Sequence, residues 1–238
     1  YMMYGYVSDY PLNALWGFRY AGTWKNNAEI ERNKTTKGYV SAGNNFYSPG
    51  APRYLDINHD GILNKQDLVY LGQADPDIYG GLQNTFKIHG FTIGVYFNYS
   101  IGGKIYNISE QWMGNNSPST NQYRYMLKAW HPLRNPDSDI PRAYSGDGLA
   151  SDRLVHDATF LRLKNVSVSY TFDLRKATGN VLKSLTLSAS GDNLCLWKKY
   201  NGFDPEVSSE SSNSALRRLD VGAYPKSRTI IFSLQLRY

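Results

Sequence analysis

Residues 229–238, which read TIIFSLQLRY, decide the fold class of this chain. Every second residue from Ile230 to Tyr238 is apolar, and the residues between them are polar except for Ile231. Successive side chains of a β-strand point to opposite faces, so this alternation predicts a strand with one apolar face. A strand of a soluble sandwich can alternate in the same way. How often the pattern recurs along the chain therefore has to decide whether this strand belongs to a soluble sandwich or to a membrane protein.

The same alternation recurs upstream in four stretches, residues 82–88, 91–101, 158–172 and 184–192. The clearest is 91–101, in which Phe91 and each second residue after it are apolar as far as Ile101. The dipeptide His89-Gly90 precedes it and predicts a tight hairpin turn, because glycine adopts positive φ without strain. A looser alternation predicts one more strand near residues 14–22.

The alternation changes phase once, inside residues 158–172. Leu161 and Leu163 occupy odd positions, whereas Val166 and Val168 occupy even ones. A β-bulge adds one residue to a strand and returns the following side chains to the same face. We therefore expect a bulge in this strand.

The connections between these strands alternate between short and long. Residues 89–90 and 173–183 form short turns, whereas residues 24–79, 103–157 and 194–226 form long loops. In an antiparallel meander, alternate connections lie at the same end of the sheet. Strands of about ten residues exceed the usual mean of about 5–6 and match a tilted bilayer span. The pattern predicts an all-β protein, a transmembrane antiparallel β-barrel with long extracellular loops.

Five to six strands are too few to close such a barrel. An open sheet edge in lipid would leave backbone groups without hydrogen-bond partners, so the rest of a larger barrel must complete the sheet. The start, Tyr1-Met2-Met3-Tyr4, has neither the basic nor the apolar region of a signal peptide. We therefore expect these residues to be an internal piece of a longer protein.

The composition agrees with strands and turns and excludes several other classes. Among 238 residues are 20 Tyr, 9 Phe, 5 Trp and 21 Gly, which favours β-structure over helices. No apolar run is long enough for a transmembrane helix. Cys195 is the single cysteine, so no disulfide framework is expected. The net charge of +6 is spread along the chain, which favours a solvated basic surface over a nucleic-acid-binding stripe.

Residues 56–67, which read DINHDGILNKQD, fit the twelve-residue calcium loop. Gly61 stands at the sixth place, where the template demands a sharp turn. Two features depart from the template, namely Asp67 in place of glutamate at the twelfth position and a preceding segment that does not predict a helix. The alternative is a turn rich in Asp and Asn that its own side-chain hydrogen bonds stabilise. The expected metal ligands for one Ca²⁺ are Asp56, Asn58, Asp60, Ile62 through its carbonyl, Asn64 and Asp67.

The other groups of candidate functional residues are weaker indications of a functional site. Three pairs of acidic residues, 75 with 77, 137 with 139 and 204 with 206, have the carboxylates that a glycosidase needs, but all lie beside prolines in predicted loops. Turn formation is the simpler role for such pairs. Trp112, Trp130 and Trp197 lie in the long loops, where they can stack on sugars or pack the loops together. We predict no catalytic residue, and the substrate-binding residues are not identified by the sequence.

Several segments, in order along nearly the whole chain, resemble the SusC/RagA-type TonB-dependent transporters of the outer membrane. They are the acidic loop DINHDGILNKQD, then ADPDIYGGLQNTF, NYSIGGKIYN, WHPLRNPDSDIPR, SDRLVHDATFLRLKNVSVSYTF, SGDNLCLWKKYNGFDPEV and GAYPKSRTIIFSLQLRY. The resemblance implies that residues 1–238 form the C-terminal part of a 22-stranded barrel in the outer membrane, with the plug and N-terminal segments absent.

The same resemblance implies a function and a set of partners. It implies active import of oligosaccharides or peptides, a SusD-type surface lipoprotein that closes over the barrel, and energy from TonB through the missing N-terminal part. The remainder of the same barrel, outer-membrane lipid and the substrate are the other expected contacts, and nucleic acid is not one. Two alternatives from other classes remain open, a secreted or surface calcium-binding β-rich adhesin and a carbohydrate-active enzyme.

Overall fold

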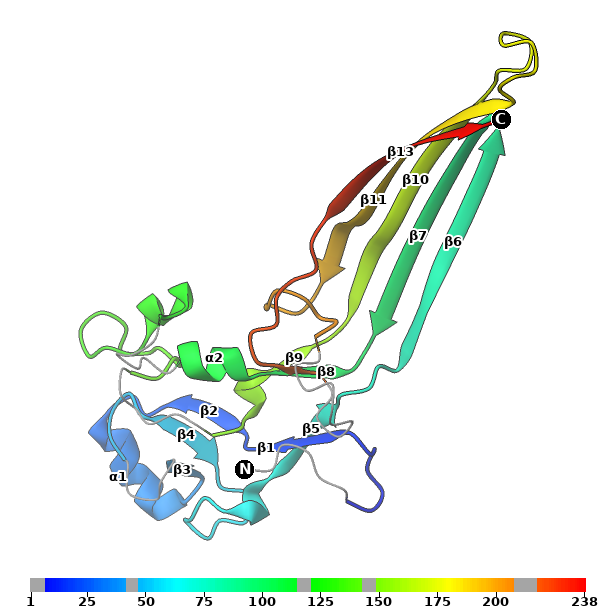
Figure 1. Ribbon diagram of the computed structural model, residues 1–238. Coiled ribbons are helices and arrows are strands. Elements are labelled where there is room, and N and C mark those ends of the chain that lie inside the picture. Colours follow the sequence, from blue (N-terminus) through cyan, green and yellow to red (C-terminus); the bar gives the residue numbers. More distant parts are fainter. Residues whose placement is uncertain (1–6, 42–46, 115–120, 143–148, 208–217) are drawn as a thin grey trace. The chain divides into compact units, whose positions relative to one another are not determined.

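The computed structural model describes residues 7–41, 47–114, 121–142, 149–207 and 218–238 (Figure 1). The chain divides into two compact units, which are described separately. The sheet unit comprises residues 76–102, 158–205 and 224–238. The loop unit comprises residues 1–75, 103–157 and 206–223.

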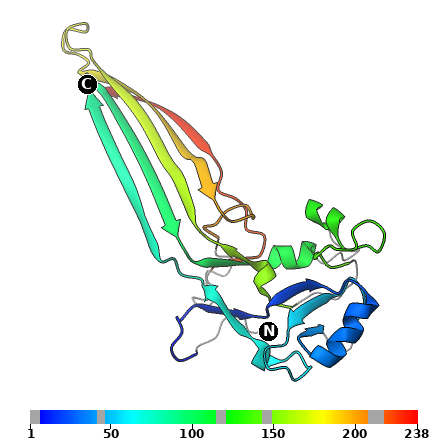
Figure 2. The same ribbon diagram turned by 180° about the vertical axis from the view of Figure 1, so that it is seen from behind.

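The sheet unit is one antiparallel sheet of five strands among the described residues. The strands are β6 (Ile78–Ile88), β7 (Phe91–Ile101), β10 (Phe160–Asp173), β11 (Ser184–Lys198) and β13 (Thr229–Arg237). Their order in the sheet is β13-β11-β10-β7-β6, so strands that follow one another along the chain are neighbours (Figures 1 and 2). This meander confirms the predicted strand arrangement.

The two short connections lie at the same end of the sheet. Ile88 pairs with Phe91, which leaves His89 and Gly90 as a two-residue turn with φ of 45° and 87°. Two successive positive φ angles are typical of the type I′ hairpin turn, whose twist matches the flanking strands. The Thr171 N–H donates to the Gly90 carbonyl over 3.1 Å, which brings this turn beside the end of β10. All the longer connections of the sheet leave from its opposite end.

The predicted bulge lies at Lys164. Leu163 pairs with Phe97 of β7, but Asn165 pairs with the next residue, Tyr96, so that Lys164 is the extra residue of β10. The inserted residue places Leu163 and Val166 on the same face of the sheet despite their odd and even numbers. The change of phase in the sequence is thus a change in register, and the apolar face continues through it.

The loop unit contains short strands and helices where the sequence predicted mainly loop. Its strands are β1 (Ala14–Gly17), β2 (Tyr20–Thr23), β3 (Tyr39–Ser41), β4 (Pro52–Leu55), β5 (Val69–Gln73), β8 (Lys104–Asn107), β9 (Val155–Asp157) and β12 (Leu219–Asp220). Its helices are α1 (Asn27–Thr36), α2 (Ile108–Met113) and the 3₁₀ turns η1 (Lys65–Asp67), η2 (Arg124–Lys128) and η3 (Asp152–Leu154). The strands form the small sheets β1-β5, β2-β4-β3 and β12-β8-β9.

Several predicted boundaries were wrong. The single strand expected near residues 14–22 is two strands, β1 and β2, which pair in different sheets. β6 begins at Ile78, inside the expected loop 24–79, and β11 continues to Lys198, into the expected loop 194–226. The part of that loop at 208–217 lies outside the described residues.

The helix α1 shows why the loop unit folds without a regular apolar pattern. The Asn26 side chain accepts the Glu29 N–H over 2.9 Å at its start, and Lys37, with φ of 46°, ends it. One apolar side chain of the helix, Ile30, is buried, and it packs in a cluster with Trp24 and Ala51. Local capping and a single anchor therefore fix this helix.

A second cluster in the loop unit consists of Tyr106, Ala150, Leu154 and Leu219. These residues come from β8, the region of η3 and β12, so distant parts of the sequence share this core. Within the described residues, no helix combines the length and the hydrophobicity that crossing a membrane requires.

Candidate functional site

One face of the five-stranded sheet carries a continuous set of apolar side chains. The register aligns Phe86, Ile93, Val168, Ala189 and Phe232 as one cross-strand row. The neighbouring rows contain the other residues predicted for this face, which are Val95, Phe97, Tyr170, Ile230, Leu234 and Leu236. The sequence therefore identified the apolar face correctly.

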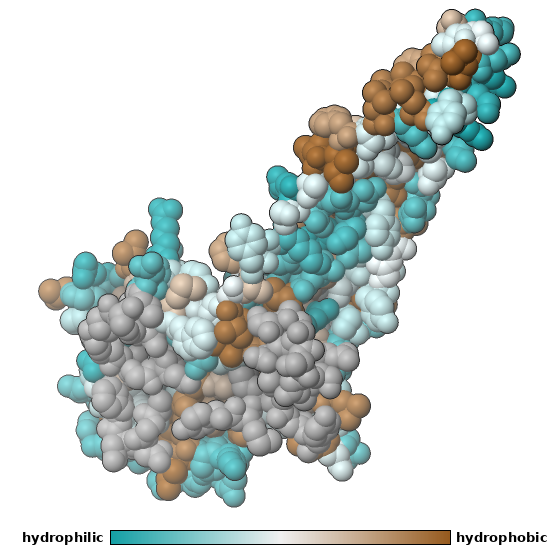
Figure 3. All heavy atoms as spheres, viewed as in Figure 1, coloured by the Kyte–Doolittle hydropathy of each residue, from teal (hydrophilic) through white to brown (hydrophobic). Residues whose placement is uncertain are grey.

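This apolar face is largely uncovered on β13. The exposed fractions are 67% for Ile230, 81% for Phe232 and 64% for Leu234. Figure 3 shows hydrophobic side chains gathered along this edge of the sheet. Soluble monomers rarely expose large contiguous apolar patches, and such a patch marks an interaction surface. The sheet thus requires an apolar medium or partner on this side.

The opposite face is rich in small hydroxyl side chains. The row next to the one above consists of Thr92, Ser169, Ser188 and Ser233, with Lys87 of β6 at its end. Thr171 and Thr186 contact each other across the strands, with 2.9 Å between their hydroxyl oxygens. One sheet thus separates an apolar face from a polar one, which is the property that a barrel wall between lipid and an aqueous lumen needs.

A buried ion pair lies at the end of the sheet away from the short turns. Arg162 Nη2 donates to Asp204 Oδ1 over 2.6 Å, and the residues are 3% and 4% exposed. Sequence reasoning missed this pair, because Arg162 resembles any polar residue of an alternating strand. The signal that was present is a charged residue between Leu161 and Leu163, since such a residue needs a partner when buried.

The paired acidic residues have structural partners. Asp204 binds Arg162, Asp75 accepts the Asn13 amide over 2.5 Å, and Asp139 lies 2.7 Å from Lys25 Nζ. Each pair thus has at least one carboxylate engaged in holding loops or strands together. This arrangement favours the structural interpretation of the three pairs over a glycosidase centre.

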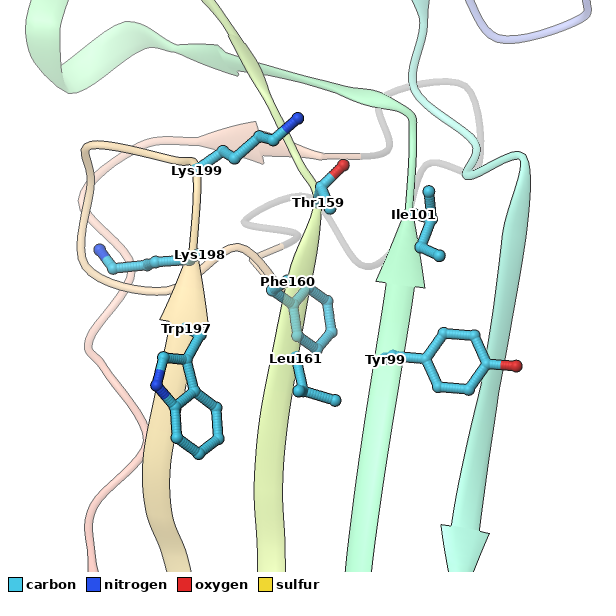
Figure 4. A pocket seen from close by; sticks show the side chains of 8 residues that line it. All are labelled: Tyr99, Ile101, Thr159, Phe160, Leu161, Trp197, Lys198 and Lys199. Carbon is cyan, nitrogen blue, oxygen red and sulfur yellow. The ribbon is translucent and has the colours of Figure 1, made fainter.

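A cavity of about 510 Å³ lies at the same end of the sheet as the ion pair (Figure 4). Tyr99, Leu161 and Trp197 line it from three adjacent strands, and the register makes them cross-strand neighbours. Trp197 was predicted to lie in a long loop, but it belongs to β11 and is 53% exposed. Lys198 and Lys199 complete one side of the cavity. Among the described residues, its lining contains no carboxylate.

The predicted metal loop connects β4 with η1 in the loop unit. Asp56 follows β4 directly and is 2% exposed, and Asp67 ends η1 and is 0% exposed. The Asp67 carboxylate accepts the N–H groups of Ile57 and Asn64, each over 2.9 Å. Asp67 thereby ties the two ends of the loop together from the interior.

The three middle ligands of the template lie closer to solvent. Asp60 Oδ2 accepts the side-chain amides of Asn58 and Asn64 over 2.9 and 3.0 Å. Asp60 Oδ1 accepts the Ile62 N–H over 2.7 Å, and this bond, with those from the two amides, lowers the pKa of the Asp60 carboxyl. Asn58, Asp60 and Asn64 are thus joined by hydrogen bonds between their side chains.

The carboxylates do not meet as a cluster by themselves. Within the described ranges, no group of three or more His, Cys, Asp or Glu side chains is arranged to hold a metal ion. A cation in the loop would therefore need the amide oxygens of Asn58 and Asn64 and the carbonyl of Ile62 as well. These are oxygen donors, which suit a hard cation such as Ca²⁺.

The chain resembles several curated proteins over nearly its whole length. TonB-dependent receptor P26 of Formosa agariphila is 30% identical over 229 residues, which are 93% of this chain and 22% of that protein. TonB-dependent receptor SusC of Bacteroides thetaiotaomicron is 23% identical over 230 residues, which are 90% of this chain and 21% of SusC. The chain thus spans less than a quarter of either relative. No protein-family model matches it.

Solved structures show the same fold. The structure of the RagAB peptide transporter matches 94% of this chain and 22% of its own chain, with a TM-score of 0.71 and 22% identity. The RagAB peptide importer in its closed-closed state matches 99% of this chain and 25% of its own, with a TM-score of 0.70 and 21% identity. Over nearly its whole length the chain is therefore similar to part of the SusC/RagA-type TonB-dependent transporters.

Proposed function

We propose that the sheet unit is a segment of the wall of an outer-membrane β-barrel that imports oligosaccharides or peptides. The observation that carries this proposal is the apolar face, which stays in register across all five strands while the other face is polar. In this arrangement the apolar face contacts lipid and the hydroxyl-rich face lines the lumen. β6 and β13, which each pair with one strand among the described residues, join the remaining strands of the same barrel.

The orientation of the sheet follows from its two kinds of end. In bacterial outer-membrane barrels the short turns are periplasmic and the long loops are extracellular. The turn at residues 89–90 and the chain end at Tyr238 thus lie on the periplasmic side. The connections that contain the loop unit are then extracellular, where a SusD-type surface lipoprotein would close over the barrel. TonB would supply energy through a part of the transporter outside this chain.

The RagAB structures are named for a peptide transporter and SusC is a named TonB-dependent receptor, which supports import rather than catalysis as the activity. The engaged acidic pairs agree with this interpretation. The adhesin alternative lacks a comparable observation in its favour.

Extraction from membranes tests the location. We expect the protein to stay in the outer-membrane fraction after a carbonate wash and to require detergent for release. Release into the aqueous fraction without detergent would contradict the barrel wall and favour a secreted adhesin.

Uptake by cells tests the cargo. A strain that lacks the gene is grown on single oligosaccharides and on defined peptides, and accumulation of labelled substrate is measured beside growth. We expect loss of uptake for one substrate class and its return when the gene is restored. Unchanged uptake of every oligosaccharide and peptide tested would contradict the import function.

A further inference from the structure

The buried carboxylate of Asp56 has an unusual hydrogen-bond environment. Its Oδ2 accepts the Gly61 N–H over 2.7 Å, which turns the carboxylate inward across the loop. Its Oδ1 is buried and has no hydrogen-bond partner among the described residues. A buried charged oxygen without a partner is costly, because it has lost its hydration without a replacement. This oxygen therefore indicates a missing positive partner inside the loop.

The side-chain amides of Asn58 and Asn64 contact Asp60, which is another of the expected ligands. The Asn64 amide nitrogen lies 3.0 Å from Asp60 Oδ2 and 3.3 Å from the Ile62 carbonyl oxygen. The Asn58 amide nitrogen lies 2.9 Å from the same Asp60 oxygen. The amide oxygens of Asn58 and Asn64 accept the N–H groups of Asp60 and Gln66 over 3.1 and 2.7 Å, and each keeps a second lone pair. With a cation present, these second lone pairs would be the amide ligands.

The backbone of the loop is already curved around this region. His59 and Gly61 have φ of 58° and 83°, and these left-handed residues reverse the chain twice within the loop. At Gly61 an added Cβ would meet no atom within 4 Å, so its backbone angle explains the glycine better than lack of space does. The loop thus changes direction sharply between Asp56 and Asp67.

We propose that residues 56–67 bind one Ca²⁺ through the side chains of Asp56, Asn58, Asp60, Asn64 and Asp67 and the carbonyl of Ile62. Asp56 Oδ1 would become a direct ligand. Each Asp67 oxygen accepts one backbone N–H and retains a lone pair for the ion. The number and flexibility of these ligands favour Ca²⁺ over Mg²⁺, which demands near-ideal octahedral geometry and keeps several waters.

The ion would have a structural role in the loop unit. Asp56 follows β4 and Asp67 precedes β5, so one cation would tie the two strands through residues that are eleven positions apart. Neutralising three carboxylates would also remove their mutual repulsion. The ligand set stands independently of the import function. The expected affinity, with a Kd of roughly 0.1–1 mM as in extracellular modules, rests on the extracellular placement proposed above.

Calcium binding to the purified full-length transporter tests the proposal. The protein is treated with a chelator, dialysed and titrated with CaCl₂ in detergent, and bound calcium is counted by equilibrium dialysis. We compare the wild-type protein with Asp56→Asn, with Asp60→Ala, which removes the side-chain oxygens that asparagine would retain, and with the control Asp9→Asn, an exposed aspartate outside the loop with φ of 70°, which asparagine tolerates. Each loop variant should bind one Ca²⁺ fewer than the wild type, and the control should bind the same number.

A second measurement separates binding from misfolding. Millimolar CaCl₂ should slow backbone hydrogen exchange of residues 56–67 in the wild type and in Asp9→Asn, whereas the same concentration of MgCl₂ should not. If Asp56→Asn fails to fold, Asp60→Ala decides, because the Asp60 side chain is exposed. Equal calcium counts in the wild type and a folded Asp60→Ala variant would overturn the proposal and leave an Asx-rich turn. That result would not affect the uptake and extraction experiments, which test the import function.

Discussion

The loop unit and the sheet unit differ in whether the chain buries their large apolar side chains. In the loop unit, Trp24 and Tyr54 are fully buried by the chain itself. In the sheet unit, Phe232 and Ile230 are 81% and 67% exposed, although they lie in a regular strand. Hydrophobicity alone therefore does not say where a residue lies. The difference identifies which part of the chain folds against itself and which part relies on its surroundings.

The comparison predicts the largest loss of stability in the loop unit at Trp24. Its ring packs with Ile30 and Ala51, and its Nε1 donates to Ser41 Oγ over 2.6 Å. Trp24→Ala should lower the free energy of unfolding by about 3–5 kcal/mol, because it leaves a cavity and an unpaired hydroxyl. Urea unfolding of the full-length protein in detergent measures this loss. Trp112→Ala, at a side chain that is 52% exposed, is the control and should change stability by about 0.5 kcal/mol or less.

A loss of similar size is expected at the buried ion pair of the sheet unit. Arg162→Met leaves Asp204 buried without its guanidinium partner and should cost about 3–5 kcal/mol. The double variant Arg162→Met with Asp204→Leu removes both charges and should cost less than the single one. Urea unfolding of both variants checks this order. A double variant that is less stable than Arg162→Met would show that the pair stabilises the protein by more than the mutual neutralisation of its two charges.

The two faces of the sheet should respond differently to an added charge. Val168→Arg places a guanidinium in the middle of the apolar face and should destabilise the protein in lipid by about 2–4 kcal/mol. Ser188→Arg, between Ser169 and Ser233 on the polar face, is the matched control and should have little effect. Asn98 also lies on the polar face, but it pairs with Arg162, which would repel a second arginine. Equal tolerance at Val168 and Ser188 would contradict the assignment of the faces.

The smallest effect is expected where the loop unit meets water. Glu31 and Lys34 form an ion pair of 2.7 Å on α1, with side chains that are 66% and 68% exposed. Glu31→Gln should cost about 0.2–0.5 kcal/mol at low salt, since exposed helical pairs contribute little. The difference should disappear in 1 M NaCl, where the Debye length falls to about 3 Å. A loss that persists at high salt would mean that Glu31 has another role.

The strand with unbroken alternation, β7, was predicted to the residue, and the others were not. β7 matches the expected residues 91–101, because every position there follows the two-residue period. β6 was predicted too short, because Gly80 and Gly81 carry no apolar signal at its start. β11 was also predicted too short. Its pairing with β10 skips Asn193 and Leu194 opposite Lys164, and this irregularity hid the last part of the strand. A regular two-residue period can be recognised in the sequence, whereas a local irregularity hides the end of a strand.

The helix α1 escaped prediction for a different reason. With Ile30 as its buried apolar residue, it lacks the three-to-four-residue repeat that marks an amphipathic helix. Its capping signal, Asn26 followed by Glu29, was nevertheless present in the sequence. At residues 56–67, the order of the oxygen-bearing residues was readable from the spacing. The buried, unpartnered oxygen of Asp56 became visible with the three-dimensional packing.

The sequence by itself determined the two-faced strands, the hairpin turn at His89-Gly90 and the order of oxygen-bearing residues in the acidic loop. Each of these depends on neighbours within a few residues, so periodicity and turn chemistry suffice. The tertiary structure decided the register that aligns Ile93, Val168 and Phe232, and it brought Arg162 to Asp204 across 42 residues. Such pairings depend on closing long loops and on burial by distant segments. A local pattern carries no information about either.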